Sequence, residues 1–135
     1  MKKIYAIIFL LIATVSIGCK KDKTDKTDQA EKQFLIGNWK MTSSTGGSIP
    51  ITDLSIYSLK ITDTNFERYT SNKLDSSLPY TLSTGISPAT NKSMRLFVFT
   101  GMTNSETYFE LSGDKLTIYY GSIAYDGTMA VFQRQ

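Results

Sequence analysis

The chain has 135 residues, of which 41% are hydrophobic and 20% charged, a balance typical of one globular domain. Its formal net charge of +3 arises entirely before Gln33, because the remainder holds eight basic and eight acidic residues. A neutral domain argues against binding to nucleic acid or anionic lipid. The sequence has no histidine and one cysteine, which excludes an intramolecular disulfide and removes the commonest general base and metal ligand.

The first 18 residues have the organisation of an export signal. A short basic start, Met1 to Lys3, precedes an uncharged apolar run from Ile4 to Ile17. This run is shorter than the roughly 20 residues that span a bilayer, and it has the length of a secretory signal. Small residues then lead directly into the single cysteine, in Ser16-Ile17-Gly18-Cys19.

This arrangement resembles a bacterial lipoprotein signal peptide, with Gly18 before the cleavage site and Cys19 as the lipid-modified residue. The resemblance implies that residues 1–18 are removed and that Cys19 anchors the chain to a membrane of the bacterial cell envelope, with the outer membrane expected. The alternative is an ordinary signal peptide cleaved nearby, which would leave a free thiol.

Residues 19–32 predict a disordered, charged tether. The triplet Lys-Thr-Asp occurs twice in succession, and Ala30 is the one apolar residue from Lys20 to Lys32. Such a segment buries too little apolar surface to offset its chain entropy. Only residues 28–36 are expected to form a helical turn, just before Gly37.

From Gln33 to Gln135 the dominant hydrophobic period is two, which predicts strands. In chain order, strands are expected around Trp39 and Met41, Tyr57 to Ile61, Phe66 to Thr70, Leu78 to Leu82, Met94 to Thr100, Phe109 to Leu111, Leu116 to Tyr120, and Thr128 to Gln135. Pro79 suggests a strand start or an edge, and Gly85 to Lys92 a loop. Met94 to Thr100 is apolar on both faces, so it is either covered on both sides or faces a cavity. Gly113-Asp114 predicts a tight hairpin turn.

About eight strands with short connections predict an all-β antiparallel sandwich or barrel. A helical turn, then Gly37-Asn38-Trp39 on the first strand, then a meander of strands resembles the lipocalin family, and more narrowly the lipocalin-like domains of bacterial lipoproteins of the Bacteroidetes type. The resemblance implies that residues 33–135 form a small eight-stranded up-and-down barrel. It also implies that Arg134, on the last strand, packs across Trp39.

The residues themselves give this pair a physical role. A buried tryptophan needs a partner for its N–H, and a guanidinium over its face adds a cation–π contact of roughly 0.5–2 kcal/mol. Gly37, Trp39 and Arg134 would then join the first strand to the last and close the barrel. The alternative is that Trp39 is simply core and Arg134 a solvated terminus.

No nucleophile elbow, phosphate-binding loop, dinucleotide fingerprint or Cys-x-x-Cys motif is present, so we expect no catalysis, no cofactor and no metal. The remaining enrichment is aromatic, with eight tyrosines and seven phenylalanines. Some could line an apolar ligand cavity with polar tips; the candidates are Tyr57, Tyr80, Phe97, Phe99, Phe109 and Tyr120. The alternative is that these side chains fill a small barrel completely.

The sequence thus favours a membrane-anchored, non-enzymatic protein that binds or transports a small apolar ligand. The alternative function is a structural or interaction lipoprotein that uses the barrel as a scaffold. Its contact loops would be Ser43 to Pro50 and Gly85 to Asn91. The sequence identifies neither the ligand nor the oligomeric state.

Overall fold

The computed structural model describes residues 24–46, 53–88, 90–102, 106–121 and 127–135. It contains helix α1 (Thr24–Leu35), a single 3₁₀ turn η2 (Leu54–Ile56) and strands β1 (Gly37–Gly46), β2 (Tyr57–Ile61), β3 (Asn65–Thr70), β4 (Lys73–Ile86), β5 (Ser93–Phe99), β6 (Glu106–Ser112), β7 (Lys115–Tyr120) and β8 (Thr128–Arg134). The expected signal peptide and Cys19 lie outside the described residues, as does the stretch from Gly47 to Pro50 in one expected contact loop.

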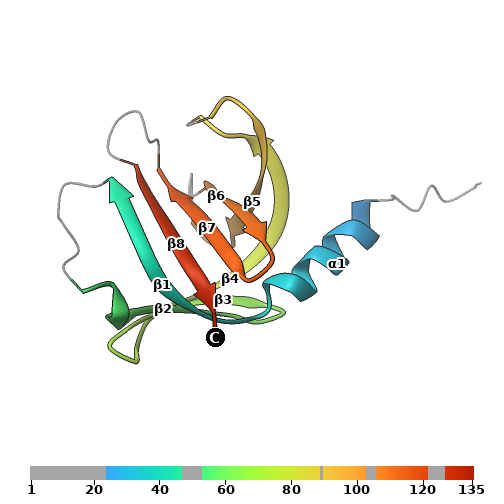
Figure 1. Cartoon of the computed structure of the whole chain (residues 1–135). Helices are drawn as coiled ribbons and strands as arrows, with labels where there is room; N and C mark the ends of the chain where they lie inside the picture. The colour runs from blue at the N-terminus through green and yellow to red at the C-terminus, as the bar shows by residue number, and fades with distance from the viewer. Residues whose placement is uncertain (1–23, 47–52, 89, 103–105, 122–126) are drawn as a thin grey trace, which may run out of the picture.

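The eight strands close into one antiparallel up-and-down barrel, in which each strand pairs with its sequence neighbours and β8 returns to β1 (Figure 1). The predicted fold class is therefore confirmed. Closure places the first and last strands in direct register, with Trp39 opposite Arg134. A closed barrel leaves no sheet edge, which removes the risk of edge-to-edge pairing.

Two tight turns set the register of neighbouring strands. Gly113, with φ +59°, opens the predicted two-residue turn between β6 and β7, where Ser112 pairs with Lys115. Between β3 and β4, Ser71 and Asn72 both have positive φ, 51° and 64°, as the commonest two-residue hairpin turn requires. Such turns let short strands pair along their whole length.

Strand β4 is longer than the sequence predicted, since it runs from Lys73 to Ile86 through Pro79. Its first half pairs with β3 as far as Pro79, and its second half pairs with β5 from Tyr80 onward. Pro79 is therefore neither a strand start nor an edge residue. It lies where β4 changes its pairing partner from β3 to β5, a position that tolerates a residue without an N–H.

Helix α1 begins at Thr24, earlier than the expected helical turn, and takes in the later part of the expected tether. Its last turn is fixed to the barrel: Leu35 is fully buried in the core, and Glu31 and Lys32 form ion pairs with Arg95 and Asp63 at 2.6 and 3.3 Å. An anchored turn supplies the helix nucleus, so the preceding charged residues can propagate it. The N-terminal part of α1 projects away from the barrel in Figure 1.

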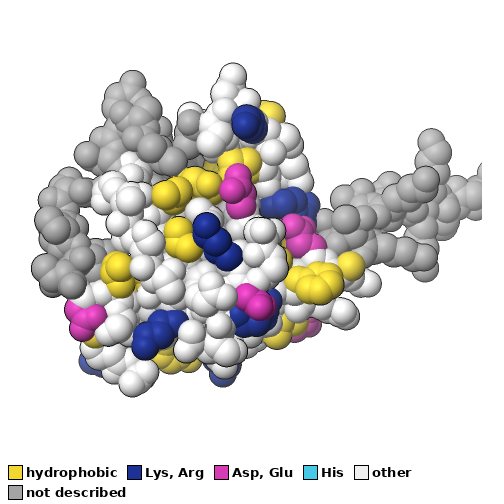
Figure 2. Space-filling view, viewed as in Figure 1, with side chains coloured by type: hydrophobic (Ala, Val, Ile, Leu, Met, Phe, Trp, Pro, Cys, Tyr) yellow, Lys and Arg dark blue, Asp and Glu magenta, His cyan; other side chains and the backbone are white. Residues whose placement is uncertain are grey.

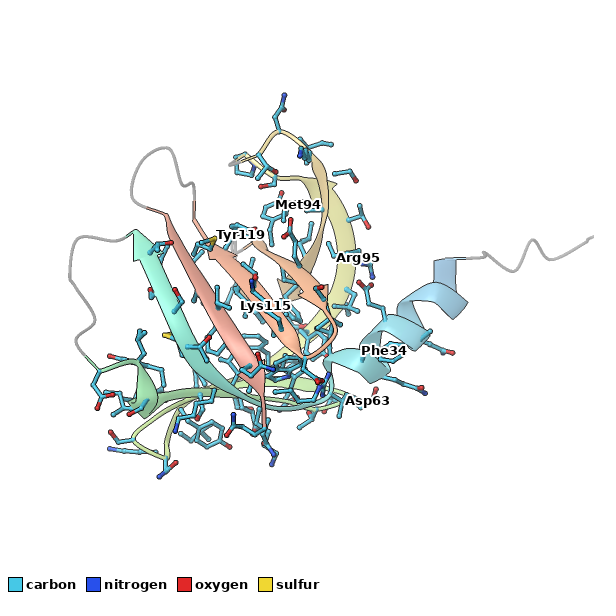
Figure 3. All side chains as sticks on the ribbon, viewed as in Figure 1. Phe34, Asp63, Met94, Arg95, Lys115 and Tyr119 are labelled. Atoms are coloured by element: carbon cyan, nitrogen blue, oxygen red, sulfur yellow. The ribbon has the colours of Figure 1, made fainter. Side chains whose placement is uncertain are left out.

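Strand β5 combines the two alternatives: Met94 and Leu96 are covered on its outer face, and Phe99 on its inner face borders a cavity. Phe97 and Phe99 point into the barrel core, whereas Met94 and Leu96 belong to a second cluster on the outer face with Tyr108, Tyr119 and Met129. Met94 and Tyr119 lie near one another in Figure 3. Tyr108 reaches across β5 to donate its hydroxyl to the carbonyl of Ile86 at 3.0 Å.

The outer surface is otherwise mixed in charge. Figure 2 shows Lys, Arg, Asp and Glu side chains interspersed over β1, β7 and β8 rather than gathered by sign. Among the described residues, no helix has both the length and the apolar character to cross a membrane. No group of three or more potential metal ligands occurs in this part of the chain either.

Candidate ligand cavity

The end of the barrel next to α1, the helix end, is closed by Trp39 and Arg134. The Arg134 guanidinium lies 4.2 Å from the centroid of the fully buried Trp39 ring, and the indole Nε1 donates to the carbonyl of Leu35 at 2.9 Å. Arg134 also donates to the carbonyls of Phe34 and Ile36 and pairs with Asp114. The contact that the sequence analysis expected between Trp39 and Arg134 is thus present, and it also holds the end of α1.

Two features of the structure explain why position 37, two residues before Trp39, is a glycine. A Cβ added at Gly37 would lie 2.6 Å from Nη1 of Arg134, closer than carbon and nitrogen atoms can approach. The φ of Gly37, +151°, also disfavours a side chain. Gly37, Trp39 and Arg134 therefore form one structural unit that joins the first and last strands.

Aromatic rings fill the half of the barrel nearest this unit. Phe97 is fully buried, and its ring centroid lies 4.4 Å from that of Phe109, 5.0 Å from Phe66 and 5.3 Å from Tyr80. The Tyr80 hydroxyl donates to the carbonyl of Thr62 at 2.9 Å. Tyr80, Phe97 and Phe109, three of the six candidate cavity residues, therefore pack in solid core.

The opposite end of the barrel, the far end, is hollow. A cavity of about 400 Å³, the main cavity, opens where β1 separates from β2, whose paired register extends only from Gly37 to Lys40 on β1. Its lining is drawn from β1, β2, β3, β4, β7 and β8 and comprises Met41, Ser44, Tyr57, Ser58, Leu59, Arg68, Tyr69, Thr70, Asp75, Tyr120, Thr128, Ala130 and Phe132. This volume falls within the range of small-molecule sites.

A second space of about 140 Å³, the side cavity, adjoins the main cavity. Arg68 and Tyr120 line both spaces, and the other side-cavity residues are mostly apolar: Phe66, Leu78, Phe99, Met102 and Thr107. Tyr57, Phe99 and Tyr120, the remaining candidate residues, thus line one or both cavities. The barrel is therefore filled at the helix end and hollow at the far end, so each of the two alternatives describes one half of it.

Arg68, the one basic residue that lines these cavities, was not predicted from the sequence, and its side chain is exposed. It pairs with Leu59 on β2, which is 3% exposed, and directly opposed residues share a face of the sheet. Its Nε donates to Ser76 Oγ at 2.9 Å on β4. The available signal was the spacing Phe66, Arg68, Thr70, which puts a charge on the same face as a core phenylalanine.

Tyr120 is the second polar group shared by both cavities. Burial raises the pKa of Tyr120 to about 12, although the nearby positive charge of Arg68 acts in the opposite direction. The phenol is therefore neutral at physiological pH, and its O–H remains a hydrogen-bond donor. The arrangement provides an apolar space with one cation and one phenol at a shared position.

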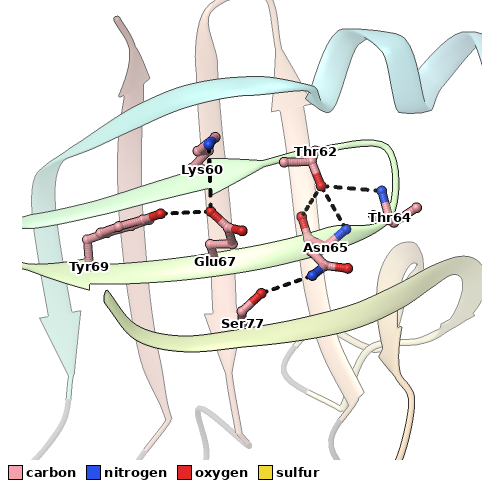
Figure 4. Close-up of polar contacts among 7 residues, drawn as sticks. All are labelled: Lys60, Thr62, Thr64, Asn65, Glu67, Tyr69 and Ser77. Carbon is pink, nitrogen blue, oxygen red and sulfur yellow. Dashed lines mark hydrogen bonds and ion pairs between the residues drawn. The ribbon is translucent and has the colours of Figure 1, made fainter. Parts of the chain in front are cut away.

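A larger hollow, of about 550 Å³, lies on the outer face over β1, β2 and β3. Its lining is mainly polar and includes Asn38, Lys40 and Lys60. Figure 4 shows the polar side chains of β2 and β3 satisfying one another: Glu67 accepts from the Tyr69 hydroxyl at 2.8 Å and lies 4.0 Å from the Lys60 ammonium. This groove differs from the main cavity in having a more polar lining.

Comparison with known proteins gives no family assignment: no protein-family model, no curated protein and no solved structure matches the chain. The resemblance to the lipocalin family rests on the chain's own residues.

Proposed function

We propose that this protein is a lipid-anchored, non-enzymatic barrel of the lipocalin-like kind that binds a small, largely apolar molecule at its far end. The observation that supports this proposal is the contrast between the two halves of one barrel. Aromatic rings fill the helix end, while about 400 Å³ beside Met41, Ala130 and Phe132 is left unfilled. Protein interiors pack densely, so a cavity of this size in so small a domain suggests a binding site.

The anchor is proposed from the sequence alone, from the apolar run that ends in Gly18-Cys19. The wild-type protein should carry a lipid adduct and partition with membranes, and Cys19→Ala should lack the adduct and be released. Intact-mass measurement of both proteins tests this. An unmodified wild-type chain would contradict it.

Binding is tested with the released Cys19→Ala protein, by native mass spectrometry for a co-purified molecule. Ser44→Phe fills the main cavity, and the neighbouring Thr45→Phe adds the same ring on the exposed face of β1. We expect a bound mass that Ser44→Phe loses and Thr45→Phe keeps. If no mass is bound, or if both variants retain it, the cavity is not the site and the scaffold function is favoured instead.

A further inference from the structure

The polar hollow on the outer face of the barrel, the outer groove, is built from several elements that meet at one place. Its volume is about 550 Å³, and its lining comes from β1, η2, β2, β3, the β3–β4 turn and Gln135. The N–H of Ser71 in the β3–β4 turn donates to the carbonyl of Ile56 in η2 at 2.8 Å, which joins two of these walls. A hollow of this volume is large enough for a small ligand.

The strand register places the polar lining residues in two adjacent rows. Lys40 on β1 lies opposite Ser58 on β2, and Ser58 lies opposite Tyr69 on β3. In the next row, Asn38 lies opposite Lys60. Because directly opposed residues share a face of the sheet and lie close together, one ligand can contact both rows at once.

The charges beside the outer groove offset one another. The Lys60 ammonium lies 4.0 Å from the carboxylate of Glu67. Hydrogen bonds from Ser55, and more weakly the charge of Lys40, hold the pKa of the Asp53 carboxyl below its ordinary value. Each lysine of the groove thus has an acidic neighbour, and this balance favours an uncharged ligand over an anion.

Uncharged polar side chains of the groove are available to a ligand. Among the described residues, the side chains of Asn38, Ser58 and Asn72 have no hydrogen-bond partner. An amide carries two donors and one acceptor, and a hydroxyl donates and accepts. Groups of this kind can satisfy ligand hydroxyls, which likewise donate and accept.

Tyr69 gives the groove an aromatic wall of fixed orientation. The side chain is half-buried, and its hydroxyl donates to Glu67 at 2.8 Å (Figure 4). This bond holds the ring in place before a ligand arrives, which lowers the entropy cost of binding. A sugar ring has apolar C–H groups that can cover an aromatic ring, and hydroxyls around its rim that need polar partners.

We propose that the outer groove binds a neutral carbohydrate, with a sugar ring against Tyr69 and its hydroxyls on Asn38, Ser58 and Asn72. This site differs from the proposed apolar site, because the outer groove and the main cavity open on opposite faces of β2 and β3. The two hollows adjoin at Ser58, Leu59 and Tyr69, which line both.

The test is a titration of isotope-labelled Cys19→Ala protein with maltohexaose, cellohexaose, xylohexaose and chitohexaose, and with inorganic phosphate as an anionic probe. We expect at least one oligosaccharide to shift the amide signals of Asn38, Lys60 and Asn72, and phosphate to leave them unchanged. The affinity for the sugar, measured by calorimetry, should not fall as the salt concentration rises, because a neutral ligand is not screened.

Variants then assign the contacts. Asn38→Ala should weaken sugar binding about fivefold, the effect of one net hydrogen bond, and Tyr69→Ala about tenfold or more. Gln133→Ala is the matched control, since it removes an exposed amide from the neighbouring β8 that does not line the groove. Gln133→Ala and the cavity-filling Ser44→Phe should both bind the sugar as the parent does. Thermal unfolding of each variant establishes that it is folded.

The other results would overturn the carbohydrate site. They are binding of phosphate alone, binding of none of the four oligosaccharides, or sugar-induced shifts centred away from the groove. Sugar binding that survives both Asn38→Ala and Tyr69→Ala would have the same meaning, as would its loss in Ser44→Phe. The apolar site is judged separately, by the co-purified mass in the main cavity, which Asn38→Ala should keep.

Discussion

At the residue scale, three side-chain positions account for how the barrel closes. Trp39 offers a flat buried ring, Arg134 covers it and ties down the carbonyls of Phe34 and Ile36, and Gly37 leaves the space that the guanidinium needs. Because the guanidinium makes hydrogen bonds and a ring contact at once, its planar shape matters as much as its charge.

We therefore expect Arg134→Ala to lower the free energy of unfolding by about 2–4 kcal/mol, from the lost ring contact and hydrogen bonds. Arg134→Lys should recover only part of this loss, since an ammonium cannot reach the same carbonyls and ring together. Gly37→Ala should cost about 1 kcal/mol or more through the clash with Arg134. Urea denaturation measures all three, with Lys115→Ala as the exposed control. If Arg134→Ala left the free energy of unfolding unchanged, the role of Arg134 in closing the barrel would be contradicted.

The buried phenol of Tyr80 makes the stability of the fold depend on pH in the alkaline range. Burial, and to a smaller extent the charge of Asp63, raises the pKa of Tyr80 to about 12 from its ordinary value of 10.0. Between these values the unfolded chain releases the proton while the folded chain retains it. The stabilisation is therefore complete below pH 10.0 and is lost as the pH rises towards about 12.

For Tyr80 this loss amounts to about 2–3 kcal/mol. Urea denaturation at pH values below and above this window should show the wild type losing stability, and Tyr80→Phe should lose less. Tyr120, whose pKa is raised in the same direction, should still contribute in that variant. An identical pH dependence in wild type and Tyr80→Phe would refute the assignment.

At the scale of elements, the last turn of α1 covers the helix end of the barrel. Leu35, the last residue of this turn, is fully buried in the core. The ion pairs of Glu31 and Lys32 connect the turn to β5 and to the β2–β3 turn. The sequence predicted a helical turn here but not the earlier start at Thr24, because the anchoring contacts come from residues distant in the chain. Period-two patterning likewise predicted most strands, whereas the passage of β4 through Pro79 depends on which neighbours it pairs with.

Leu35→Ala should cost about 2–5 kcal/mol in unfolding free energy, as expected for a core leucine. The adjacent Phe34 is 67% exposed, so Phe34→Ala should change stability by no more than about 0.5 kcal/mol. Chemical denaturation of these two variants measures how much the last turn of α1 contributes to stability. Similar small effects for both would show that α1 contributes little to the barrel.

At the scale of the whole molecule, one barrel combines a filled half and a hollow half. The all-β class could be predicted, because strand alternation is a local signal. Closure into a barrel was expected only from the family resemblance carried by Gly37, Trp39 and Arg134. The hollow half could not, since it depends on how side chains from six strands divide the interior volume. Arg68 was missed because a charged strand residue is normally assigned to the outside. Its register with Leu59 places it on the cavity side of β3, where its side chain is still exposed.

We propose that the apolar ligand binds at the far end of the barrel, and not in the outer groove or the filled core. Amide chemical-shift mapping of isotope-labelled Cys19→Ala protein during titration with dodecanoate tests it most directly. We predict the largest shifts at Tyr57, Arg68 and Tyr120, with Leu35 and Phe109 at the helix end little changed. Shifts centred on Lys40 and Lys60 in the outer groove, or no specific shifts, would contradict it.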